Sequence, residues 1–339
     1  MSDLGFGIVG TGFIAGILAD AITRAPGAHL AAVSSRSLAK AQDFVEGRSG
    51  VAAVEGLETL LARADVAAVY VAIPTAAKEA VTLAAIAAGK HVLVDKPLPD
   101  AEAVRRMTQA AAEKGVLFMD ATHFSHHPRT ATIRAESAAR IGRPRSLNTT
   151  FYFPFDDREN IRFDPAQEPM GAVGDMAWYS MRAVVEYLRP AGALTKVSVV
   201  PERDPATGAV IRLSGVLGFE SGESATLDVG YTAGTAIMDL SLLGTAGMIT
   251  MDDFVLDWHD SFPFDHPDTP VGFVHRSGMA HRSAFDFVET PSDLPQEVRM
   301  IRAFADAVAS EAAEDWGAYS KASLETQTLL DAIWRACSA

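Results

Sequence analysis

The hydrophobic and polar positions of this 339-residue chain change their pattern near residue 122. Before that point, short apolar runs alternate with amphipathic, alanine-rich stretches, which is the alternation expected of βαβ units. The expected strands are residues 4–9, 28–34, 51–54, 66–72, 90–94 and 116–120, and the expected helices are residues 12–24, 37–46, 56–63, 76–88 and 100–114. Several of these strands are continuously apolar, as Val69–Ile73 is, and this is typical of strands buried on both faces of a parallel sheet.

After an expected helix at residues 128–140, extended segments dominate the pattern. We expect strands at residues 145–155, 194–201, 209–219, 223–232, 235–243 and 247–251, and helices at residues 171–188, 295–312 and 320–336. The links Glu220–Glu223 and Thr232–Thr235 are short, polar and contain glycine, so they predict an antiparallel meander. Residues 257–295 show no clear period and predict a long irregular segment.

These patterns predict an α/β protein with two domains. Residues 1–122 are expected to form a parallel sheet with its helices, and residues 123–339 an α+β domain with an open, mostly antiparallel sheet. The length supports the division, since 339 residues exceed what one hydrophobic core normally sustains.

Composition narrows the function classes. The net charge of −14 argues against nucleic acid and anionic membranes as partners, and no apolar stretch reaches the roughly 20 residues of a membrane span. The single cysteine, Cys337, excludes an intrachain disulfide, a cysteine zinc site and an iron–sulfur cluster. It also favours a reducing compartment, so we expect a cytoplasmic protein.

A glycine turn follows the first expected strand and opens the first expected helix. In Gly10-x-Gly12-x-x-Ala15, the first glycine permits a tight turn, the second lets the backbone approach a pyrophosphate, and Ala15 is small enough for close helix–strand packing. The alternative is a turn that only joins strand to helix. The five βα units that follow favour the first interpretation, a Rossmann domain that binds a dinucleotide.

The end of the second expected strand bears on which dinucleotide binds. NAD-specific domains carry an Asp or Glu there, which binds the ribose 2′-hydroxyl, whereas this chain has Ser34–Ser37, including Arg36, with Lys40 one helical turn further on. Hydroxyl groups and a guanidinium can bind a 2′-phosphate that a carboxylate would repel. We therefore expect NADP(H) to be favoured over NAD(H). The alternative is that Arg36 is a solvated surface residue beside the adenine.

Two further segments suggest chemistry. Asp95-Lys96-Pro97 follows the fifth expected strand, at the sheet edge where ligands of open α/β domains bind. Asp175 and Tyr179 are four residues apart in the helix expected at residues 171–188, so they share one helical face.

With the glycine turn, these segments resemble the family of glucose–fructose oxidoreductase, inositol dehydrogenase and MocA, over essentially the whole chain. Asn160–Pro165 is similar to the branch that contains dimeric dihydrodiol dehydrogenase and glucose–fructose oxidoreductase, which also has tyrosine at the catalytic position. Inositol dehydrogenase has histidine there, which argues against that activity. Asp95, Met170 and Ala177-Trp178 depart from the family's usual Glu, Gly and Gly-Cys, and we expect the bulky Trp178 to narrow the pocket.

The resemblance implies oxidation of a carbinol or reduction of a carbonyl in a sugar, sugar derivative or cyclic diol. We assign Tyr179 as general acid/base and Lys96 as its electrostatic partner, with Asp175 orienting substrate hydroxyls or Lys96. A free tyrosine is a poor base, with a pKa of about 10. A lysine ammonium about 4 Å away would lower the pKa of the phenol by roughly three units. The alternative for Tyr179 is a core aromatic residue.

Two other residues are candidates for contact with the substrate or the cofactor. Arg162 lies in the matched Asn-Ile-Arg segment, and the alternative for it is a surface ion pair. His123 follows the sixth expected strand, and the alternative for it is a hydrogen-bonded structural histidine.

The candidate residues form two expected sites, one for the cofactor and one for the substrate. The cofactor site is expected to contain Gly10, Gly12, Phe13, Ile14, Ser35, Arg36, Lys40, Ile73, Pro74, Asp95 and Lys96. The substrate site is expected to contain Lys96, His123, Arg162, Asp175 and Tyr179. No metal is expected, because Asp257, His259, Asp260, Asp265, His266, His275 and His281 lack the tight spacing of known sites.

The resemblance also implies a homodimer or homotetramer formed through the face of the second sheet. A second hypothesis from another class is a regulator that binds the cofactor without turnover. The presence of Lys96, Asp175 and Tyr179 favours the enzyme, because a sensor needs no acid/base pair.

Overall fold

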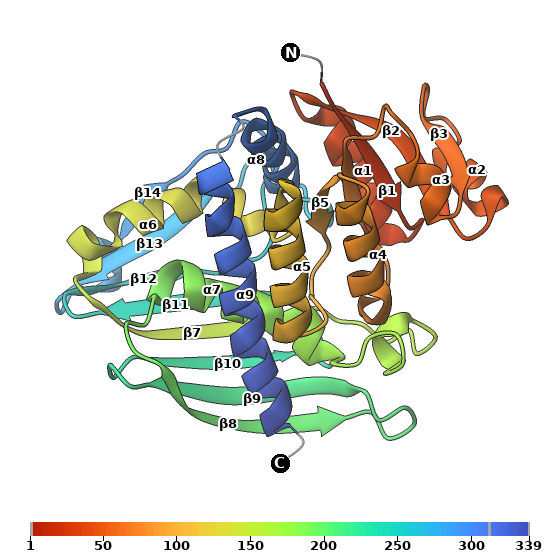
Figure 1. Ribbon diagram of the computed structural model, residues 1–339. Helices are drawn as coiled ribbons and strands as arrows, with labels where there is room; N and C mark the ends of the chain where they lie inside the picture. Colours follow the sequence, from red (N-terminus) through yellow and green to blue (C-terminus); the bar gives the residue numbers. More distant parts are fainter. Residues whose placement is uncertain (1–2, 311–312, 338–339) are drawn as a thin grey trace. The chain divides into compact units, whose positions relative to one another are not determined.

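The computed structural model describes residues 3–310 and 313–337, and the chain forms two compact units (Figure 1). The first unit contains the chain up to His123 together with Glu297–Leu324, and the second contains Phe124–Gln296 together with the chain from Glu325. The expected boundary at residue 122 lies one residue before the end of the first segment. Glu297–Leu324, which we expected in the second domain, belongs to the first unit.

The first unit is built on a six-stranded parallel sheet. Its strands are β1 (Leu4–Val9), β2 (Ala28–Ser35), β3 (Ala52–Glu55), β4 (Ala68–Val71), β5 (His91–Val94) and β6 (Phe118–Asp120). The spatial order is β3-β2-β1-β4-β5-β6, which is that of doubly wound dinucleotide-binding domains. Phe6, Ile8, Tyr70 and Leu93 are fully buried, as the continuously apolar strands predict.

Helices connect these strands as expected. They are α1 (Phe13–Arg24), α2 (Leu38–Val45), α3 (Leu57–Leu61), α4 (Thr75–Ala87) and α5 (Ala101–Lys114). Two helices follow late in the chain, α8 (Gln296–Ser310) and α9 (Ala313–Ala336), and α9 begins before the expected residue 320. Phe304 of α8 contacts Phe6 of β1 with ring centroids 5.4 Å apart, so α8 covers part of the first sheet.

The second unit is built on an eight-stranded mixed sheet. Its strands are β7 (Pro144–Tyr152), β8 (Leu194–Arg203), β9 (Val210–Phe219), β10 (Ser224–Gly230), β11 (Ile237–Gly244), β12 (Gly247–Met251), β13 (Gly272–Ser277) and β14 (Asp286–Glu289). The order is β14-β13-β12-β11-β7-β10-β9-β8, and β7 pairs in parallel with β10 while every other pair is antiparallel.

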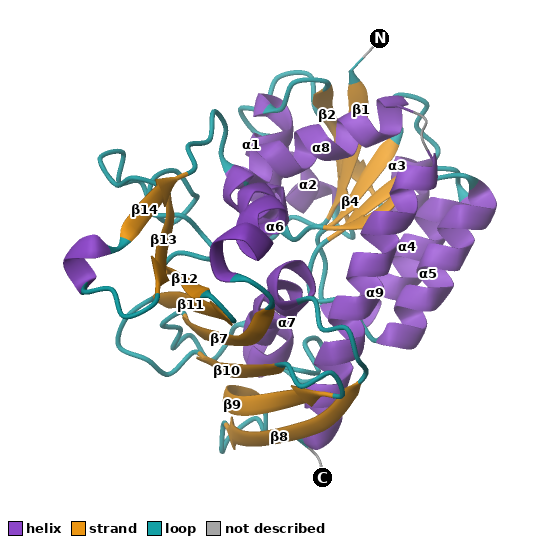
Figure 2. Ribbon diagram, turned by 90° about the vertical axis from the view of Figure 1, so that its left-hand side faces the viewer, coloured by secondary structure: helices purple, strands orange, loops and turns teal. Residues whose placement is uncertain are grey.

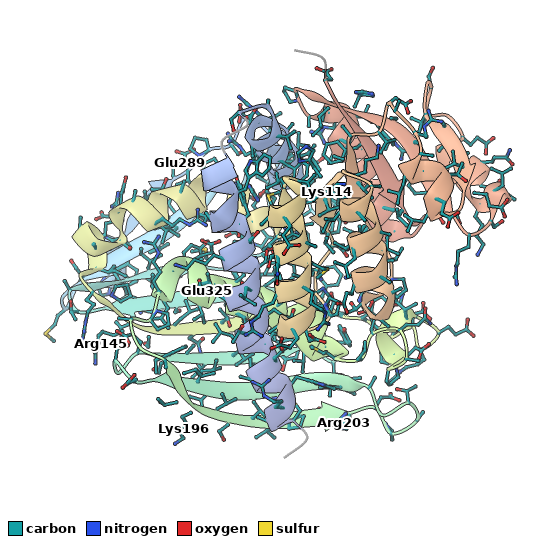
Figure 3. The ribbon with its side chains drawn as sticks, viewed as in Figure 1. Lys114, Arg145, Lys196, Arg203, Glu289 and Glu325 are labelled. Atoms are coloured by element: carbon teal, nitrogen blue, oxygen red, sulfur yellow. The ribbon has the colours of Figure 1, made fainter. Side chains whose placement is uncertain are left out.

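One face of this sheet is covered by helices. Helix α6 (Pro128–Ile141) and the helical segment Val173–Leu188, of which α7 (Trp178–Ala183) is the α-helical centre, pack on that face (Figure 2). At the end of α9, the Arg203 guanidinium of β8 lies 5.8 Å from the Trp334 ring centroid. Arg203 is labelled beside this end of α9 in Figure 3. Inward residues such as Leu213 and Leu227 are buried by this packing.

Two expectations for the second unit were wrong. Thr232–Thr235 does not close a hairpin, because β7 lies between β10 and β11 and interrupts the meander. Residues 257–295 are not wholly irregular, because they contain β13 and β14 at the sheet edge. Turn residues report only local geometry and do not reveal a distant strand inserted between their neighbours. The short edge strands carry polar residues such as His275 and Asp286 and so lack the apolar alternation.

Candidate active site

The glycine turn has the geometry of a phosphate-binding turn. Gly10 has φ +113°, and a Cβ at this position would lie 2.1 Å from the Ala72 carbonyl oxygen, so only glycine fits. Gly12 is the N-cap of α1, and a Cβ built there has no heavy atom within 4 Å. The first turn of α1 therefore adjoins open space, as required of a pyrophosphate site.

At the end of β2, some polar side chains are hydrogen-bonded within the protein, while others are exposed and could bind a ligand. The buried Ser34 hydroxyl donates to the Gly56 carbonyl oxygen at 2.8 Å and so fixes the end of the strand. Ser35 is partly exposed, and its Oγ accepts a hydrogen bond from the Ser37 backbone N–H at 3.4 Å. Arg36 and Lys40 are exposed, and neither has a hydrogen-bond or ion-pair partner among the described residues. Both cations are therefore available to an anion at this edge.

The other cofactor candidates of the first unit lie at the same carboxyl edge of the sheet. Phe13 and Ile14 begin α1. Ile73 and Pro74 stand between β4 and α4, and Asp95 and Lys96 follow β5. Phe13 is 73% exposed, which is unusual for a phenylalanine and provides an apolar surface beside the open space at Gly12. These residues and the glycine turn fit a dinucleotide.

The residues around Lys96 are held by groups that the sequence did not single out. The Tyr70 hydroxyl donates to Asp95 Oδ1 at 3.1 Å, and the Asp95 backbone N–H donates to the Val71 carbonyl oxygen at 3.1 Å. Beyond Lys96, the Lys78 ammonium donates to the Pro97 carbonyl oxygen at 2.8 Å. Tyr70 lies in the apolar strand β4 and Lys78 in helix α4. The sequence pattern alone therefore predicts a core residue and a surface residue, not contacts beside Lys96.

His123 ends the first segment of the first unit and is buried, with 6% of its surface exposed. Its expected contact with substrate stays a prediction. His127, which directly follows the 3-10 turn His123–His126, has a structural role, because its Nδ1 accepts the Arg129 backbone N–H at 3.0 Å and caps α6.

In the second unit, Arg162 and Asp175 come together. The Arg162 Nε donates to Asp175 Oδ2 at 2.6 Å, and the Tyr231 hydroxyl donates to the same oxygen at 3.3 Å. The Asp175 carboxylate raises the pKa of the Arg162 guanidinium, while burial and the charge of Asp175 raise the pKa of Tyr231 well above its ordinary value. Tyr231 is thus a neutral donor and Asp175 an oriented anion. Sequence analysis missed Tyr231, which is 56 residues from Asp175.

Aromatic rings surround this ion pair. Phe155 and Phe163 are stacked at 6.2 Å, and the Tyr231 ring lies 5.9 Å from Phe163. The Arg162 guanidinium lies 5.3 Å from the Phe155 ring centroid, a favourable cation–π distance. Arg162 therefore forms an ion pair, which was the alternative considered for it. The surrounding aromatic rings restrict the orientations of the Arg162 guanidinium and the Asp175 carboxylate.

Tyr179 lies one helical turn after Asp175, within the segment Val173–Ala183. Its side chain is 6% exposed, and its ring meets Phe151 edge-on with centroids 5.5 Å apart. The segment Val173–Ala177 has π-helical hydrogen bonding, a feature frequent at functional sites.

Trp178 corrects one expectation. Its side chain is fully buried, and the Arg182 guanidinium lies 5.8 Å from its ring centroid. A ring packed within the protein does not face an open pocket, so the expectation that Trp178 narrows the pocket was wrong.

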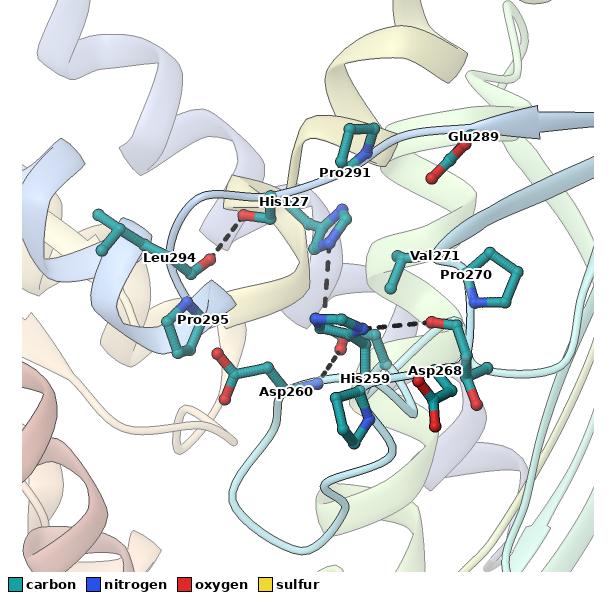
Figure 4. A pocket seen from close by; sticks show the side chains of 14 residues that line it. His127, His259, Asp260, Asp268, Pro270, Val271, Glu289, Pro291, Leu294 and Pro295 are labelled. Carbon is teal, nitrogen blue, oxygen red and sulfur yellow. Dashed lines mark hydrogen bonds and ion pairs between the residues drawn. The ribbon is translucent and has the colours of Figure 1, made fainter.

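A separate cavity of about 240 Å³ lies in the second unit (Figure 4). It is lined by His127, Asp257, His259, Asp260, Pro267, Asp268, Thr269, Pro270, Val271, Glu289, Pro291, Ser292, Leu294 and Pro295. Three of the residues considered for a metal line it, namely Asp257, His259 and Asp260. Within residues 3–310 and 313–337, no group of three or more His, Cys, Asp or Glu side chains is arranged to hold a metal ion.

The buried Asp257 in this cavity gives a pH-dependent prediction. Burial raises its pKa, although the Asp260 backbone N–H and the charges of Arg129 and His259 oppose the shift. The folded state therefore keeps the Asp257 proton to higher pH than the unfolded state, and this contribution to stability is lost as pH rises through the raised pKa.

Asp257→Asn keeps an acceptor for the Asp260 N–H, 2.9 Å away, and removes the charge. In urea unfolding from mildly acidic to mildly alkaline pH, the free energy of unfolding of the variant should therefore increase relative to that of the native protein as pH rises. Asp268→Asn, at an exposed position of the same cavity, should show no such trend. A constant difference between Asp257→Asn and the native protein would contradict the expectation.

A parallel sheet with this glycine turn, together with a mostly antiparallel second sheet, defines a protein of the dinucleotide-binding α/β class. The chain belongs to the GFO/IDH/MocA oxidoreductase family. The family's NAD-binding Rossmann model matches residues 4–122, and a GFO/IDH/MocA C-terminal domain model matches residues 134–250.

Similar proteins act on sugars. The chain is 32% identical over 330 residues to a dTDP-3,4-didehydro-2,6-dideoxy-alpha-D-glucose 3-reductase of Streptomyces violaceoruber, covering 93% of this chain and 90% of the relative. It is 29% identical over 228 residues to D-xylose 1-dehydrogenase (NADP(+)) 2 of Haloferax volcanii, covering 67% of this chain and 69% of that one. The crystal structure of a 3-ketoreductase from Actinomadura kijaniata in complex with NADP and TDP-benzene has a TM-score of 0.86, at 26% identity over 99% of this chain and 98% of the other.

Among the helices of the described chain, none has both the length and the apolar character needed to cross a membrane.

Proposed function

We propose that this protein is an NADP(H)-dependent oxidoreductase that interconverts a carbonyl and a carbinol on a sugar, and that a keto group of a nucleotide-linked deoxysugar is its substrate. The observation that carries the proposal is the full-length similarity to the dTDP-sugar 3-reductase, which spans 93% of this chain and 90% of the relative. The carboxyl edge of the first sheet, with its glycine turn and Lys96, and the Asp175–Tyr179 helix provide the chemical groups.

The cofactor site would be formed by the glycine turn and the exposed cations after β2. Gly10 and Gly12 would admit the pyrophosphate, while Ser35, Arg36 and Lys40 would bind the 2′-phosphate that distinguishes NADP(H). When bound, the nicotinamide supplies or accepts the hydride. Ile73, Pro74 and Asp95, at the ends of β4 and β5, would border the nicotinamide half.

The chain's own side chains carry out the proton transfer of the proposed reaction. In reduction, Tyr179 donates its hydroxyl proton to the substrate carbonyl oxygen, and Lys96 stabilises the phenolate that remains. Lys96 and Tyr179 belong to different units of the structure, and their cooperation is part of the proposal. Asp175, oriented by Arg162 and Tyr231, accepts hydrogen bonds from substrate hydroxyls and fixes the sugar ring. His123 would add a further polar contact to the substrate.

The assay is NADPH consumption by the purified protein with dTDP-linked keto-deoxysugars, free ketoses, aldoses and dicarbonyls. The proposal expects the highest kcat/KM with a nucleotide-linked ketone. Tight NADPH binding without turnover of any of these substrates would contradict it and would support the cofactor-binding regulator.

Arg36→Ser tests the assignment of the cofactor. Loss of a charge-assisted contact of about 1.5–3 kcal/mol should raise KM for NADPH by roughly 10- to 100-fold and leave KM for NADH nearly unchanged. Arg24→Ser, which removes an exposed arginine from the last turn of α1, should change neither value. Equal losses for NADPH and NADH in Arg36→Ser, or a clear preference of the native protein for NADH, would contradict the role.

We further propose a homodimer or homotetramer that associates through the open face of the second sheet. This face carries the exposed side chains of Val200 and Val216 beside the Arg212–Asp228 pair. Apolar and paired polar groups of this kind are typical of non-obligate interfaces. Sedimentation of the native chain and of Val200→Asp should show assembly only for the native chain, and a native chain that sediments as a monomer would contradict the proposal.

A further inference from the structure

A buried lysine that the proposed chemistry does not use lies in the first turn of α4. Lys78 is 1% exposed, and its ammonium donates to the Pro97 carbonyl oxygen at 2.8 Å and to Thr75 Oγ1 at 3.3 Å. Moving an ammonium from water into a protein carries a large desolvation cost before compensation. A neutral side chain of similar volume would fill the space without that cost, so the position of the charge calls for an explanation beyond packing.

The segment that Lys78 contacts includes Lys96. The residues on either side of Lys96 are held from within the unit, Asp95 by the Tyr70 hydroxyl at 3.1 Å and Pro97 by the Lys78 ammonium at 2.8 Å. Pro97 has no backbone N–H, so its carbonyl is its only backbone group able to form a hydrogen bond. The Lys78 contact restrains the backbone after Lys96, while before it the Asp95 side chain is held by Tyr70 and the Asp95 backbone N–H by the Val71 carbonyl oxygen. Together these contacts limit the positions from which the Lys96 side chain can extend.

We propose that Lys78 is a positioning residue for Lys96 and acts through the Pro97 carbonyl. The proposal rests on the role of Lys96 given under the proposed function. Loss of the Lys78 ammonium would leave the Pro97 carbonyl without this donor and let the Asp95–Pro97 segment relax. Displacement of a catalytic group by about 1 Å can cost up to roughly 100-fold in rate.

The chain contains a matched control. Lys90 also donates from its ammonium to backbone carbonyl oxygens, those of Arg63 at 3.0 Å and Val66 at 2.7 Å. It lies in the same unit but directly before β5, at the opposite end of the strand from Lys96. Replacing Lys90 therefore removes the same type of contact without touching the Asp95–Pro97 segment.

The experiment compares Lys78→Met, Lys78→Arg, Lys90→Met, Lys96→Met and the double variant Lys78→Met/Lys96→Met. For each protein, kcat, KM for NADPH, the pH dependence of kcat and the thermal midpoint are measured with the substrate that the native protein turns over best. If Lys78→Met does not fold, Lys78→Gln, which retains a shorter donor, replaces it in both the single and the double variant.

The proposal expects Lys78→Met to lower kcat by roughly 10- to 100-fold with KM for NADPH changed much less. The pH limb governed by Tyr179 should move to higher pH, in the same direction as in Lys96→Met but by less, because both changes weaken the positive field that stabilises the phenolate. Lys78→Arg should recover part of kcat, and Lys90→Met should lower only the thermal midpoint. The double variant should have the kcat of Lys96→Met within about twofold, since residues that act through one another are not additive.

Other results would overturn the proposal in distinguishable ways. If Lys96→Met is impaired while Lys78→Met changes only the thermal midpoint, or if the two losses multiply in the double variant, Lys78 does not act through Lys96. If Lys96→Met itself keeps the native kcat and pH profile, the proposed role of Lys96 fails, and the role of Lys78 fails with it.

Discussion

Tyr179→Phe is expected to lower kcat by roughly 10²- to 10⁴-fold, the range associated with loss of a general acid/base. Phenylalanine keeps the ring that packs against Phe151 at 5.5 Å and Phe124 at 6.3 Å, so the substitution removes only the hydroxyl. The proton for the substrate oxygen would then come from water, without a positioned donor. Steady-state kinetics with NADPH and the preferred ketone, with circular dichroism to confirm folding, provide the measurement.

Tyr187→Phe is the matched control for that substitution. Tyr187 follows on the same helical segment, its ring also packs against Phe124, and its hydroxyl is hydrogen-bonded to Thr130 Oγ1 at 2.8 Å. Burial raises the pKa of its phenol to about 12, which keeps it neutral and structural. Its loss should reduce stability by about 1 kcal/mol and spare kcat. Near-normal turnover in Tyr179→Phe, or an equal loss in Tyr187→Phe, would refute the assignment of Tyr179.

Local sequence signals were sufficient for the parallel sheet of the first unit and its connecting helices, but they did not show that Glu297–Leu324 also belongs to this unit. Each βα unit carries its own period and its own turn residues, and the turn at Gly10 and Gly12 has a backbone requirement that can be inferred from glycine alone. The structure confirms the six strands and their connecting helices, with the strand order of dinucleotide-binding domains. Candidate residues at the ends of strands could be placed together in advance, because parallel strands bring their carboxyl ends to one edge.

The second unit depends more on long-range pairing, and there the predictions were weaker. Nothing near Thr232–Thr235 indicates that β7, more than 80 residues earlier, pairs between β10 and β11. Tyr231 could not be connected with Asp175, since the contact depends on how β10 packs against the helix. The Arg162–Asp175 pair was open to two interpretations because sequence gives the charge of a residue but not its partner.

A buried ion pair in the second unit could not be predicted from the sequence either, because its partners, Arg129 and Asp253, are 124 residues apart. The Arg129 side chain is almost fully buried and makes three contacts that join α6 to the chain beyond β12. Its Nη1 donates to Asp253 Oδ1 at 2.5 Å and to the Gly272 carbonyl oxygen at 3.3 Å, and its Nη2 donates to the Asp253 carbonyl oxygen at 2.7 Å. Removing the guanidinium therefore leaves one buried carboxylate and two buried carbonyl groups without this donor.

Arg129→Met should destabilise the protein by about 3–5 kcal/mol, the cost of leaving an uncompensated charge in the interior. Burial already raises the pKa of Asp253, and the Arg129 charge opposes that shift. Without Arg129 the pKa of Asp253 rises further, so the folded state holds this proton to still higher pH and the deficit in stability grows as pH increases. Urea unfolding of the native protein and the variant across neutral pH measures both the loss and its slope.

Arg140→Met on the same helix is the comparison for this loss. Arg140 pairs with Glu136 at 2.5 Å, but both side chains are partly exposed, at 29% and 45%, so its loss should cost less than about 1 kcal/mol. Arg129→Met/Asp253→Asn removes both charges and should recover part of the stability lost in Arg129→Met, because the buried carboxylate no longer needs a partner. If the double variant is as unstable as the sum of its single changes, or if the deficit of Arg129→Met does not vary with pH, the instability comes from packing rather than from the stranded charge.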